Sequence, residues 1–347
     1  PQIAVLEEKG GAGGSLADML ALLRLAGSHA VPVPLAETAL ADGRTLSIVE
    51  PGPADADAIC EVIREAFGNR PVVDPPPPAL AETPDTVAAA LAGGFGVLAL
   101  VDGMPVGIVI VSVDGPMAGI HRVSVRPGYQ RQGIASAMVE VAIELLTARG
   151  ASAVELIARE EFPQVVAWWR RHGFGEVARR GTSLTLARQL PVRLEAPTAE
   201  ATQAIGRRLA AVVRAGDVII ASGDLGAGKT TLAQGLGAGL GVAGAIISPT
   251  FVLSRVHPST VGGPALVHVD AYRLGSFAEL EDLDLEVSLD DSVTLVEWGA
   301  GIAEALAEDY LEVDIRRSVD PDDETRWIFL TPIGGRWTAA RPELEAL

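Results

Sequence analysis

The sequence contains few of the side chains that most often build cross-links and metal sites. Cys60 is the one cysteine among 347 residues, so this sequence can form no internal disulfide and no cysteine-based zinc site. The five histidines show no metal-ligand spacing. Lysine is also scarce, because Lys9 and Lys229 stand against 25 arginines. Codon bias accounts for such a preference for arginine. The scarcity of lysine nevertheless draws attention to the lysine at position 229.

Long apolar runs are absent as well. The longest, such as residues 106–113, fall short of the roughly 18 residues that a membrane-spanning helix needs. The first residues show no basic stretch followed by an apolar run, the pattern of a secretory leader. We therefore expect a cytoplasmic protein that makes no contact with a membrane.

Basic side chains are outnumbered, 27 against 45 acidic ones, which gives a net charge of −18. A protein that binds nucleic acid through its own electrostatics needs the opposite sign. Residues 194–347 carry 11 basic and 24 acidic side chains, a net charge of −13, whereas residues 1–193 carry −5. The acidity of the second half suits docking on a protein better than direct binding to RNA.

The length and the apolar content predict two folded units. At about 150 residues per domain, 347 residues correspond to about two domains, and 48% hydrophobic residues can supply their cores. A break at 189–191 separates a first unit, 44–190, from a second, 191–347. An N-terminal extension, 1–43, precedes them and shows helical spacing of its apolar residues over 16–25.

The first unit alternates predicted strands and helices. Asp102-Gly103 between two apolar runs predicts a β-hairpin. The predicted strands cover 45–50, 97–101, 106–113, 120–125, 153–158 and 183–187. The predicted helices cover 53–67, 134–149 and 163–172.

A phosphate-binding motif opens the second unit. It matches G-x-x-x-x-G-K-[ST] at every fixed position, directly after a short apolar strand, 218–221. The glycines let backbone N–H groups converge on a phosphate at the start of a helix. Lys229 is expected to reach the β- and γ-phosphates, and the Thr230 hydroxyl to bind Mg²⁺. The expected ATP-binding residues are Gly223, Asp224, Leu225, Gly226, Ala227, Gly228, Lys229, Thr230 and Thr231.

Two carboxylates are placed to complete this site. Asp270 ends the apolar run 266–270, and Glu297 ends the run 293–297. A P-loop ATPase needs an acid near the metal, commonly at the end of a neighbouring strand. A carboxylate at a strand end is often simply solvated, but two of them in order after a P-loop favour a catalytic site.

Four ordered motifs resemble the TsaE (YjeE) family, the small ATPase of bacterial threonylcarbamoyladenosine (t6A) tRNA modification. They lie at 223–231, at 248–251 (Ser-Pro-Thr-Phe), at 268–274 (His-Val-Asp-Ala-Tyr-Arg-Leu) and at 296–298 (Val-Glu-Trp), and the resemblance covers about 192–318. It implies an ATPase that resets the TsaD–TsaB complex between turnovers. That complex transfers threonylcarbamoyl to the adenosine beside the anticodon, so tRNA is reached only indirectly.

The same resemblance assigns roles to single residues. It implies that Thr230 and Glu297 hold Mg²⁺, and that Asp270 polarises water or supports the metal. It also implies that the loop 248–251 senses the nucleotide, with Thr250 at the ATP. Gly299 stands where family members commonly carry proline, a departure that leaves the metal ligand unchanged.

In the first unit, residues 125–135 resemble the pyrophosphate-binding motif of GNAT acetyltransferases, [QR]-x-x-G-x-[GA]. Small residues at the start of a helix let backbone N–H groups approach a pyrophosphate. The resemblance covers about 44–188 and implies acetyl-CoA as the ligand. The expected acetyl-CoA contacts are Val125, Gln130, Arg131, Gly133, Ile134 and Ala135.

Acyl-CoA binding is better supported than acyl transfer. Trp169 occupies the position where family members often place a tyrosine as the acid for the departing thiolate, and an indole cannot serve so. The asparagine usual earlier on that helix is missing too. His121 and Glu155 are candidate bases, and a purely structural role suits each of them equally well.

We therefore expect an α/β chain, with a GNAT acyl-CoA fold built on a mixed sheet followed by a P-loop NTPase α/β domain. The expected function is ATP hydrolysis in t6A modification, joined to acetyl-CoA binding and the acetylation of an amine. Two alternatives stay open: a P-loop small-molecule kinase, and a GNAT domain that only binds acyl-CoA or acts as a scaffold. Arg255 and Arg273 are the only arginines between Lys229 and Arg316, too few for the basic lid of a kinase.

Overall fold

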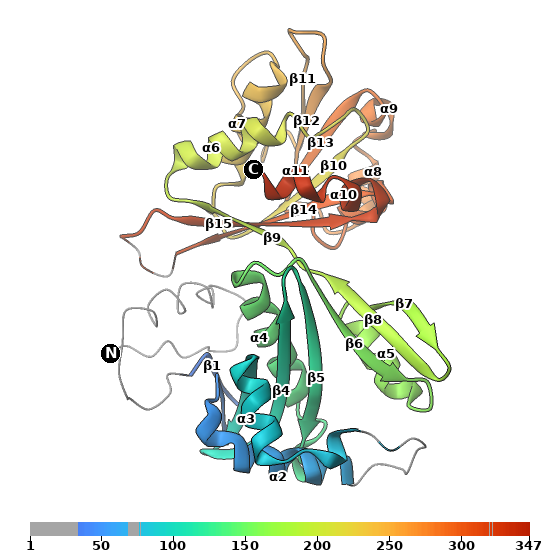
Figure 1. Cartoon of the computed structure of the whole chain (residues 1–347). Coiled ribbons are helices and arrows are strands. Elements are labelled where there is room, and N and C mark those ends of the chain that lie inside the picture. The colour runs from blue at the N-terminus through green and yellow to red at the C-terminus, as the bar shows by residue number, and fades with distance from the viewer. Residues whose placement is uncertain (1–33, 69–75, 77, 319, 321) are drawn as a thin grey trace. The chain divides into compact units, whose positions relative to one another are not determined.

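The computed structural model describes residues 34–68, 76, 78–318, 320 and 322–347. These residues form two compact units, and the boundary between them in the sequence lies between Leu190 and Pro191. The helix expected over 16–25 lies outside the described residues. Each unit is a mixed α/β structure, as the sequence predicts (Figure 1).

The first unit is built on one eight-stranded sheet with the order β1-β2-β3-β4-β5-β6-β8-β7. Its strands are β1 (Ala36–Ala39), β2 (Thr45–Val49), β3 (Gly94–Val101), β4 (Met104–Asp114), β5 (Met117–Val125), β6 (Ala153–Arg159), β7 (Gly175–Arg180) and β8 (Ser183–Gln189). All neighbours are antiparallel except β5 and β6. The unit begins before the expected residue 44, because β1 pairs with β2.

Helices cover both faces of this sheet. They are η1 (Pro53–Asp55), α2 (Ala56–Gly68), η2 (Pro78–Ala81), α3 (Pro84–Ala92), η3 (Pro127–Tyr129), α4 (Ile134–Ala148) and α5 (Pro163–Arg171). Ile108 and Ile110 of β4 pack in the core beneath α2 and α3. Val109 and Val111 point to the opposite face, into the core with α4 and α5. Successive side chains of β4 point to opposite faces of the sheet, and helices cover both faces. The continuous apolar run of β4 is therefore buried on both sides.

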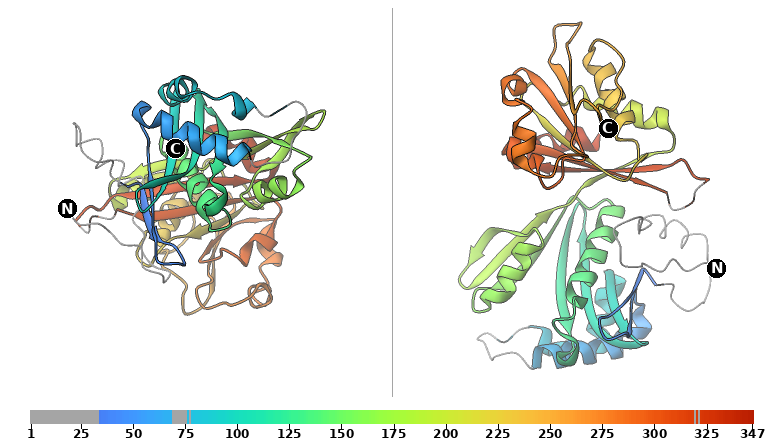
Figure 2. Two further views of the ribbon diagram at one scale, coloured as in Figure 1. Left: turned by 90° about the horizontal axis from the view of Figure 1, so that it is seen from below. Right: turned by 180° about the vertical axis from the view of Figure 1, so that it is seen from behind.

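Strands β5 and β6 part from each other after a short contact. They pair in parallel only from Met117 to Gly119, against Ala153 to Glu155, and then diverge (Figures 1 and 2). An extra residue in β5 interrupts its pairing with β4, and Arg122 has a φ of 50° at this bulge. Arg122 is anchored there by its Nε, which donates to Glu82 Oε1 at 2.6 Å.

The second unit is built on a seven-stranded sheet with the order β11-β12-β13-β10-β14-β15-β9. Its strands are β9 (Val192–Ala196), β10 (Val218–Ser222), β11 (Ser254–His257), β12 (Ala265–Asp270), β13 (Ser292–Glu297), β14 (Tyr310–Arg317) and β15 (Arg326–Ile333). The central strands β12, β13, β10 and β14 are parallel. Their carboxyl ends therefore meet at one edge, where ligands bind in sheets of this kind.

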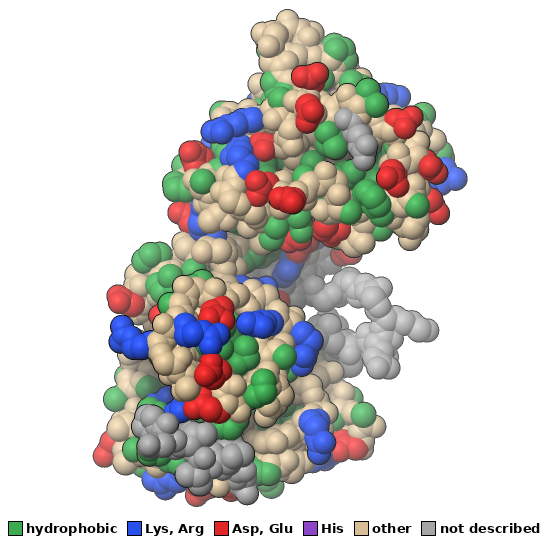
Figure 3. All heavy atoms as spheres, turned by 90° about the vertical axis from the view of Figure 1, so that its right-hand side faces the viewer, with side chains coloured by type: hydrophobic (Ala, Val, Ile, Leu, Met, Phe, Trp, Pro, Cys, Tyr) green, Lys and Arg blue, Asp and Glu red, His purple; other side chains and the backbone are tan. Residues whose placement is uncertain are grey.

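Helices also cover both faces of the second sheet. They are α6 (Ala199–Leu209), α7 (Lys229–Leu240), α8 (Phe277–Glu281), α9 (Glu286–Leu289), η4 (Ala303–Leu306), α10 (Gly334–Ala339) and α11 (Arg341–Glu345). Ile219 of β10 lies in the core with α6, α7 and Trp337. Val218 and Ile220 lie in the core on the other face, with Leu280. On the face that Figure 3 shows, several acidic side chains of this unit are exposed.

Among the described residues, no helix is both long and apolar enough to cross a membrane.

Candidate functional site

The P-loop connects the end of β10 to the start of α7. Gly223, Gly226 and Gly228 have φ values of 132°, 77° and 115°, which side chains rarely adopt. A Cβ on Gly223 would lie 2.3 Å from the carbonyl oxygen of Ile315. The loop conformation therefore requires the glycines that the motif contains, and it leads directly into the first turn of α7.

Lys229 is held inside this loop. Its side chain is buried, with 4% of its surface exposed. Its Nζ donates to the carbonyl oxygens of Gly223 at 2.6 Å and Asp224 at 3.0 Å, and lies 3.8 Å from the centre of the Trp298 ring. Burial lowers the pKa of Lys229, and the nearby carboxylates, Glu297 first among them, act in the opposite direction. Among the described residues, no carboxylate forms a salt bridge with this ammonium group.

The structure brings Thr230 and Glu297 together. Asp270 and Glu297 pair in register at the ends of the parallel strands β12 and β13, and both are buried. Thr230 Oγ1 donates to Glu297 Oε1 at 2.8 Å. Hydroxyl and carboxylate oxygens are the ligands that Mg²⁺ prefers. The two residues that the TsaE resemblance implies as Mg²⁺ ligands, Thr230 in the first turn of α7 and Glu297 at the end of β13, are therefore in direct contact.

Asp270 anchors the loop 248–251. Its Oδ2 accepts from Ser248 Oγ at 2.7 Å and from Thr250 Oγ1 at 2.6 Å, while its Oδ1 accepts from the Tyr272 N–H at 3.0 Å. Phe251, next to Thr250, is 91% exposed. Asp270 thus fixes the position of Thr250, and both carboxylate oxygens already have donors.

Two residues at this site were not assigned a role from the sequence. His268 is completely buried, and its Nε2 lies 2.8 Å from Glu297 Oε1. Trp298 has a φ of 61° and places its ring against Tyr272 as well as over Lys229. The position of His268 two residues before Asp270 on a strand was the available signal, since such residues share a face.

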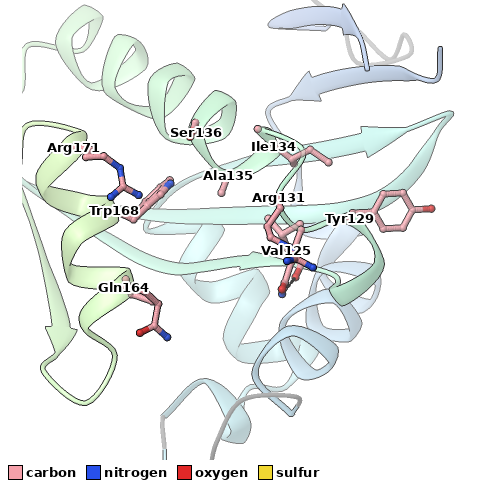
Figure 4. Close-up of a pocket in the computed structure, with 12 residues that line it drawn as sticks. Val125, Tyr129, Arg131, Ile134, Ala135, Ser136, Gln164, Trp168 and Arg171 are labelled. Carbon is pink, nitrogen blue, oxygen red and sulfur yellow. Dashed lines mark hydrogen bonds between the residues drawn. The ribbon is translucent and has the colours of Figure 1, made fainter. Parts of the chain in front are cut away.

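A cavity of about 380 Å³ lies in the first unit, beside the start of α4 (Figure 4). All six residues expected to bind acetyl-CoA line it: Val125, Gln130, Arg131, Gly133, Ile134 and Ala135. The remaining lining residues are Tyr129 and Ser136 near the same helix, and Gln164, Val165, Trp168 and Arg171 of α5. The ring of Tyr129 points away from the other labelled side chains.

The chemistry of the cavity suits an anion with an extended apolar part. Gly133 is the N-cap of α4 with a φ of 79°, and as a glycine it has no side chain to cap this helix end. The first backbone N–H groups of α4 and the positive end of its dipole therefore face the cavity. Arg131 and Arg171 add positive charge, and Trp168 supplies an apolar wall.

The residues considered for acyl transfer lie elsewhere. Trp169 is buried against Trp168 and Phe174, with ring centres 4.7 and 4.9 Å away, so it belongs to the core. His121 Nε2 lies 2.9 Å from Ser112 Oγ. Burial first, and then Arg122, lowers the pKa of His121, while Glu155 opposes this shift. Neither His121 nor Glu155 is among the described lining residues of the cavity.

The two units are similar to different families of known proteins. Residues 196–326 match the family described as "Threonylcarbamoyl adenosine biosynthesis protein TsaE", and residues 57–174 match "Acetyltransferase (GNAT) family". A Streptomyces coelicolor protein named "tRNA threonylcarbamoyladenosine biosynthesis protein TsaE" is 61% identical over 138 residues, which are 39% of this chain and 93% of that protein. The Bacillus subtilis protein of that name is 39% identical over 147 residues, covering 42% and 89%.

Two solved structures are each similar to a part of this chain. Bacillus subtilis YdiB is 31% identical, with a TM-score of 0.38, and covers 45% of this chain and 95% of that one. PaiA N-acetyltransferase from Thermoplasma acidophilum, solved with coenzyme A, is 13% identical with a TM-score of 0.38, covering 42% and 98%. On the sequence matches, the chain belongs to the TsaE family through its second unit and carries a domain of the GNAT family in its first.

Proposed function

We propose that the second unit binds ATP with Mg²⁺ and hydrolyses it in support of the TsaD–TsaB transferase of t6A modification, in the cytoplasm. The observation that carries this proposal is the hydrogen bond between Thr230 and Glu297 at the start of the P-loop helix. It occurs in a unit whose Streptomyces relative, 61% identical, is named for t6A biosynthesis.

The residues of the site divide the work between binding and charge compensation. The loop 223–228 presents its backbone N–H groups to the phosphates, and Lys229 turns from its carbonyl partners toward them. The Thr230 hydroxyl donates a hydrogen bond to Glu297, so its oxygen lone pairs are available to a cation. Mg²⁺, when bound, neutralises charge on the β- and γ-phosphates. Asp270 keeps Thr250 at the mouth of the site.

We infer the partners from the net charge of the second unit and from its membership of the TsaE family. The net charge of −13 over residues 194–347 disfavours direct tRNA binding by this unit. A protein complex that itself holds the tRNA removes this difficulty, and TsaD–TsaB is that complex in the family. We therefore place tRNA one step away from the nucleotide site.

The test measures phosphate release from ATP without an added acceptor, with and without TsaD–TsaB. An ATPase releases phosphate, and stimulation by TsaD–TsaB identifies the partner. Release that occurs only with a small-molecule acceptor would instead identify a kinase. Lys229→Ala should abolish nucleotide binding. Arg255→Ala is the matched control, because it removes an exposed cation of the same unit.

We further propose that the first unit binds acetyl-CoA, and the cavity beside α4 carries this proposal. The uncapped start of α4 and Arg131 suit the pyrophosphate, and Trp168 suits the pantetheine arm. Acetylation of an amine is a finer expectation. It lacks the usual acid for the departing thiolate, because Trp169 stands at that position and lies in the core. A unit that only binds acyl-CoA is the alternative.

Calorimetric titration with acetyl-CoA tests this second proposal. Arg171→Ala should weaken binding, because Arg171 lines the cavity, whereas Arg170→Ala should not, because Arg170 lies outside it beside Glu176. No heat of binding with the unaltered chain would refute the site. Consumption of acetyl-CoA in the presence of a peptide amine would identify the unit as a transferase, and its absence as a binding module.

A further inference from the structure

The buried histidine of β12 lies directly beneath the predicted metal ligand. His268 shares the face of β12 that carries Asp270, because the two are separated by one residue. Asp270 pairs in register with Glu297, so His268 is the diagonal neighbour of Glu297 on the adjoining strand. The imidazole therefore approaches the carboxylate from the interior of the protein, where it has no exposed surface.

Both hydrogen bonds from described residues to this carboxylate fall on one oxygen. Glu297 Oε1 accepts from His268 Nε2 at 2.8 Å and from Thr230 Oγ1 at 2.8 Å. The first donor comes from the neighbouring strand and the second from α7. Two donors on one oxygen fix the plane of the carboxylate and leave Oε2 for a ligand.

The other nitrogen of the imidazole supports the same conclusion. His268 Nδ1 is buried and has no hydrogen-bond partner among the described residues. A buried polar atom without a partner is costly, and an apolar side chain of similar size would avoid that cost. The bond from Nε2 to Glu297 is thus the contact that accounts for an imidazole at this position.

We propose that His268 is a positioning residue for the Mg²⁺ site: by donating from Nε2, it holds the Glu297 carboxylate in the orientation that binds the metal together with Thr230. The inference rests on the proposed function of the second unit. Groups that orient a metal ligand in this way typically change metal affinity by about 10- to 100-fold when they are removed. A histidine that only filled the core would leave metal affinity unchanged.

Three variants of the full chain separate these roles. His268→Leu fills the space without a donor. His268→Gln returns an N–H donor at about the distance of Nε2 from Cβ, and His268→Asn carries a donor that is too short to reach Glu297. Each variant is checked for folding by circular dichroism. Binding of a fluorescent ATP analogue is then measured in EDTA and over a Mg²⁺ titration.

We expect all folded variants to bind the nucleotide in EDTA within about twofold of the unaltered chain, because the loop and Lys229 are untouched. His268→Leu and His268→Asn should need about 10- to 100-fold more Mg²⁺ to reach the metal-dependent gain in affinity. His268→Gln should stay near the unaltered chain. Should His268→Leu fail to fold, the comparison of Asn with Gln decides the matter in the same way.

A normal Mg²⁺ response of folded His268→Leu or His268→Asn would overturn the role of His268 and leave the proposed function intact. Equal losses in His268→Asn and His268→Gln would also overturn it, since the donor would then not matter. If the unaltered chain bound no nucleotide at all, the proposed function itself would fail. The three results are distinguishable within one set of titrations.

Discussion

At the scale of single residues, the proposed nucleotide site contains a lysine in a sequence that otherwise uses arginine almost throughout. Lys229 reaches two loop carbonyl oxygens and the Trp298 ring from one compact ammonium group. The planar fork of arginine is broader and rigid, so it would not enter the same space. The scarcity of lysine in the composition therefore points to the residue that the fold holds at its phosphate loop.

The lowered pKa of Lys229 predicts a pH dependence of nucleotide binding. Only the charged form attracts phosphate, and burial lowers the pKa of Lys229 from its ordinary 10.5. Affinity should thus be full below the lowered pKa and fall as the pH rises through it, before pH 10.5 is reached. Stability should change in the opposite sense, because the unfolded chain binds the proton more tightly over this window.

The measurement is nucleotide affinity between about pH 7 and about pH 11, a range that extends past the ordinary pKa of lysine, with Arg255→Ala as the control that should follow the same curve. An affinity that stays constant over this range would show that the charge of Lys229 is not the binding group.

Sequence reasoning found the residues of the motifs but not the contacts between them. The requirement of a P-loop for an acid at a neighbouring strand end left Asp270 and Glu297 as candidates, and only the resemblance to the TsaE family paired Glu297 with Thr230. The bond from His268 to Glu297 depends on the register of β12 against β13, which no local pattern specifies. Similarly, the helical phase of α5 decides that Trp168 lines the cavity and Trp169 the core.

At the scale of elements, the strand and helix patterns of the sequence were informative where side chains alternate clearly. The Asp102-Gly103 turn and the helix after the glycine motif occur as predicted. Strands β1 and β7 were not predicted, because β7 is exposed throughout, β1 is only half-buried at best, and neither shows apolar alternation. Pairing with β2 and β8 is what makes them strands.

The packing of α6 on α7 predicts a large effect of one methyl group. A Cβ on Gly235 would lie 2.1 Å from the carbonyl oxygen of Gln203, and one on Gly206 would lie 2.4 Å from that of Leu232. The two helix backbones are in contact, so Gly235→Ala must push them apart. We expect a loss of about 1–3 kcal/mol of unfolding free energy despite the better helix propensity of alanine.

Thermal or denaturant unfolding measures this loss. Gly275→Ala is the matched control, because apart from its chain neighbours no atom of a described residue lies within 4 Å of its Cβ position. Equal stability of the two variants would contradict the close packing of α6 on α7.

At the scale of the whole molecule, each unit carries its own cores on both faces of its own sheet. We expect calorimetry of the full chain to show two unfolding transitions. Acetyl-CoA should raise only the transition of the first unit, and ATP with Mg²⁺ only that of the second. At a ligand concentration 100-fold above Kd, each shift corresponds to about 2.7 kcal/mol.

In Lys229→Ala, ATP should no longer raise the unfolding transition of the second unit. Acetyl-CoA should still raise the transition of the first unit, and this second shift serves as the internal control. Movement of both transitions by either ligand would contradict the assignment of one site to each unit.

The central claim is that ATP turnover at the P-loop supports t6A formation, and reconstitution tests it most directly. TsaD, TsaB, their substrates and tRNA are combined with the full chain or with Lys229→Ala, and t6A is counted per transferase complex. We predict many turnovers with the unaltered chain and no more than about one with Lys229→Ala, since an uncharged loop cannot hold the nucleotide. Sustained multiple turnover with Lys229→Ala would contradict the account.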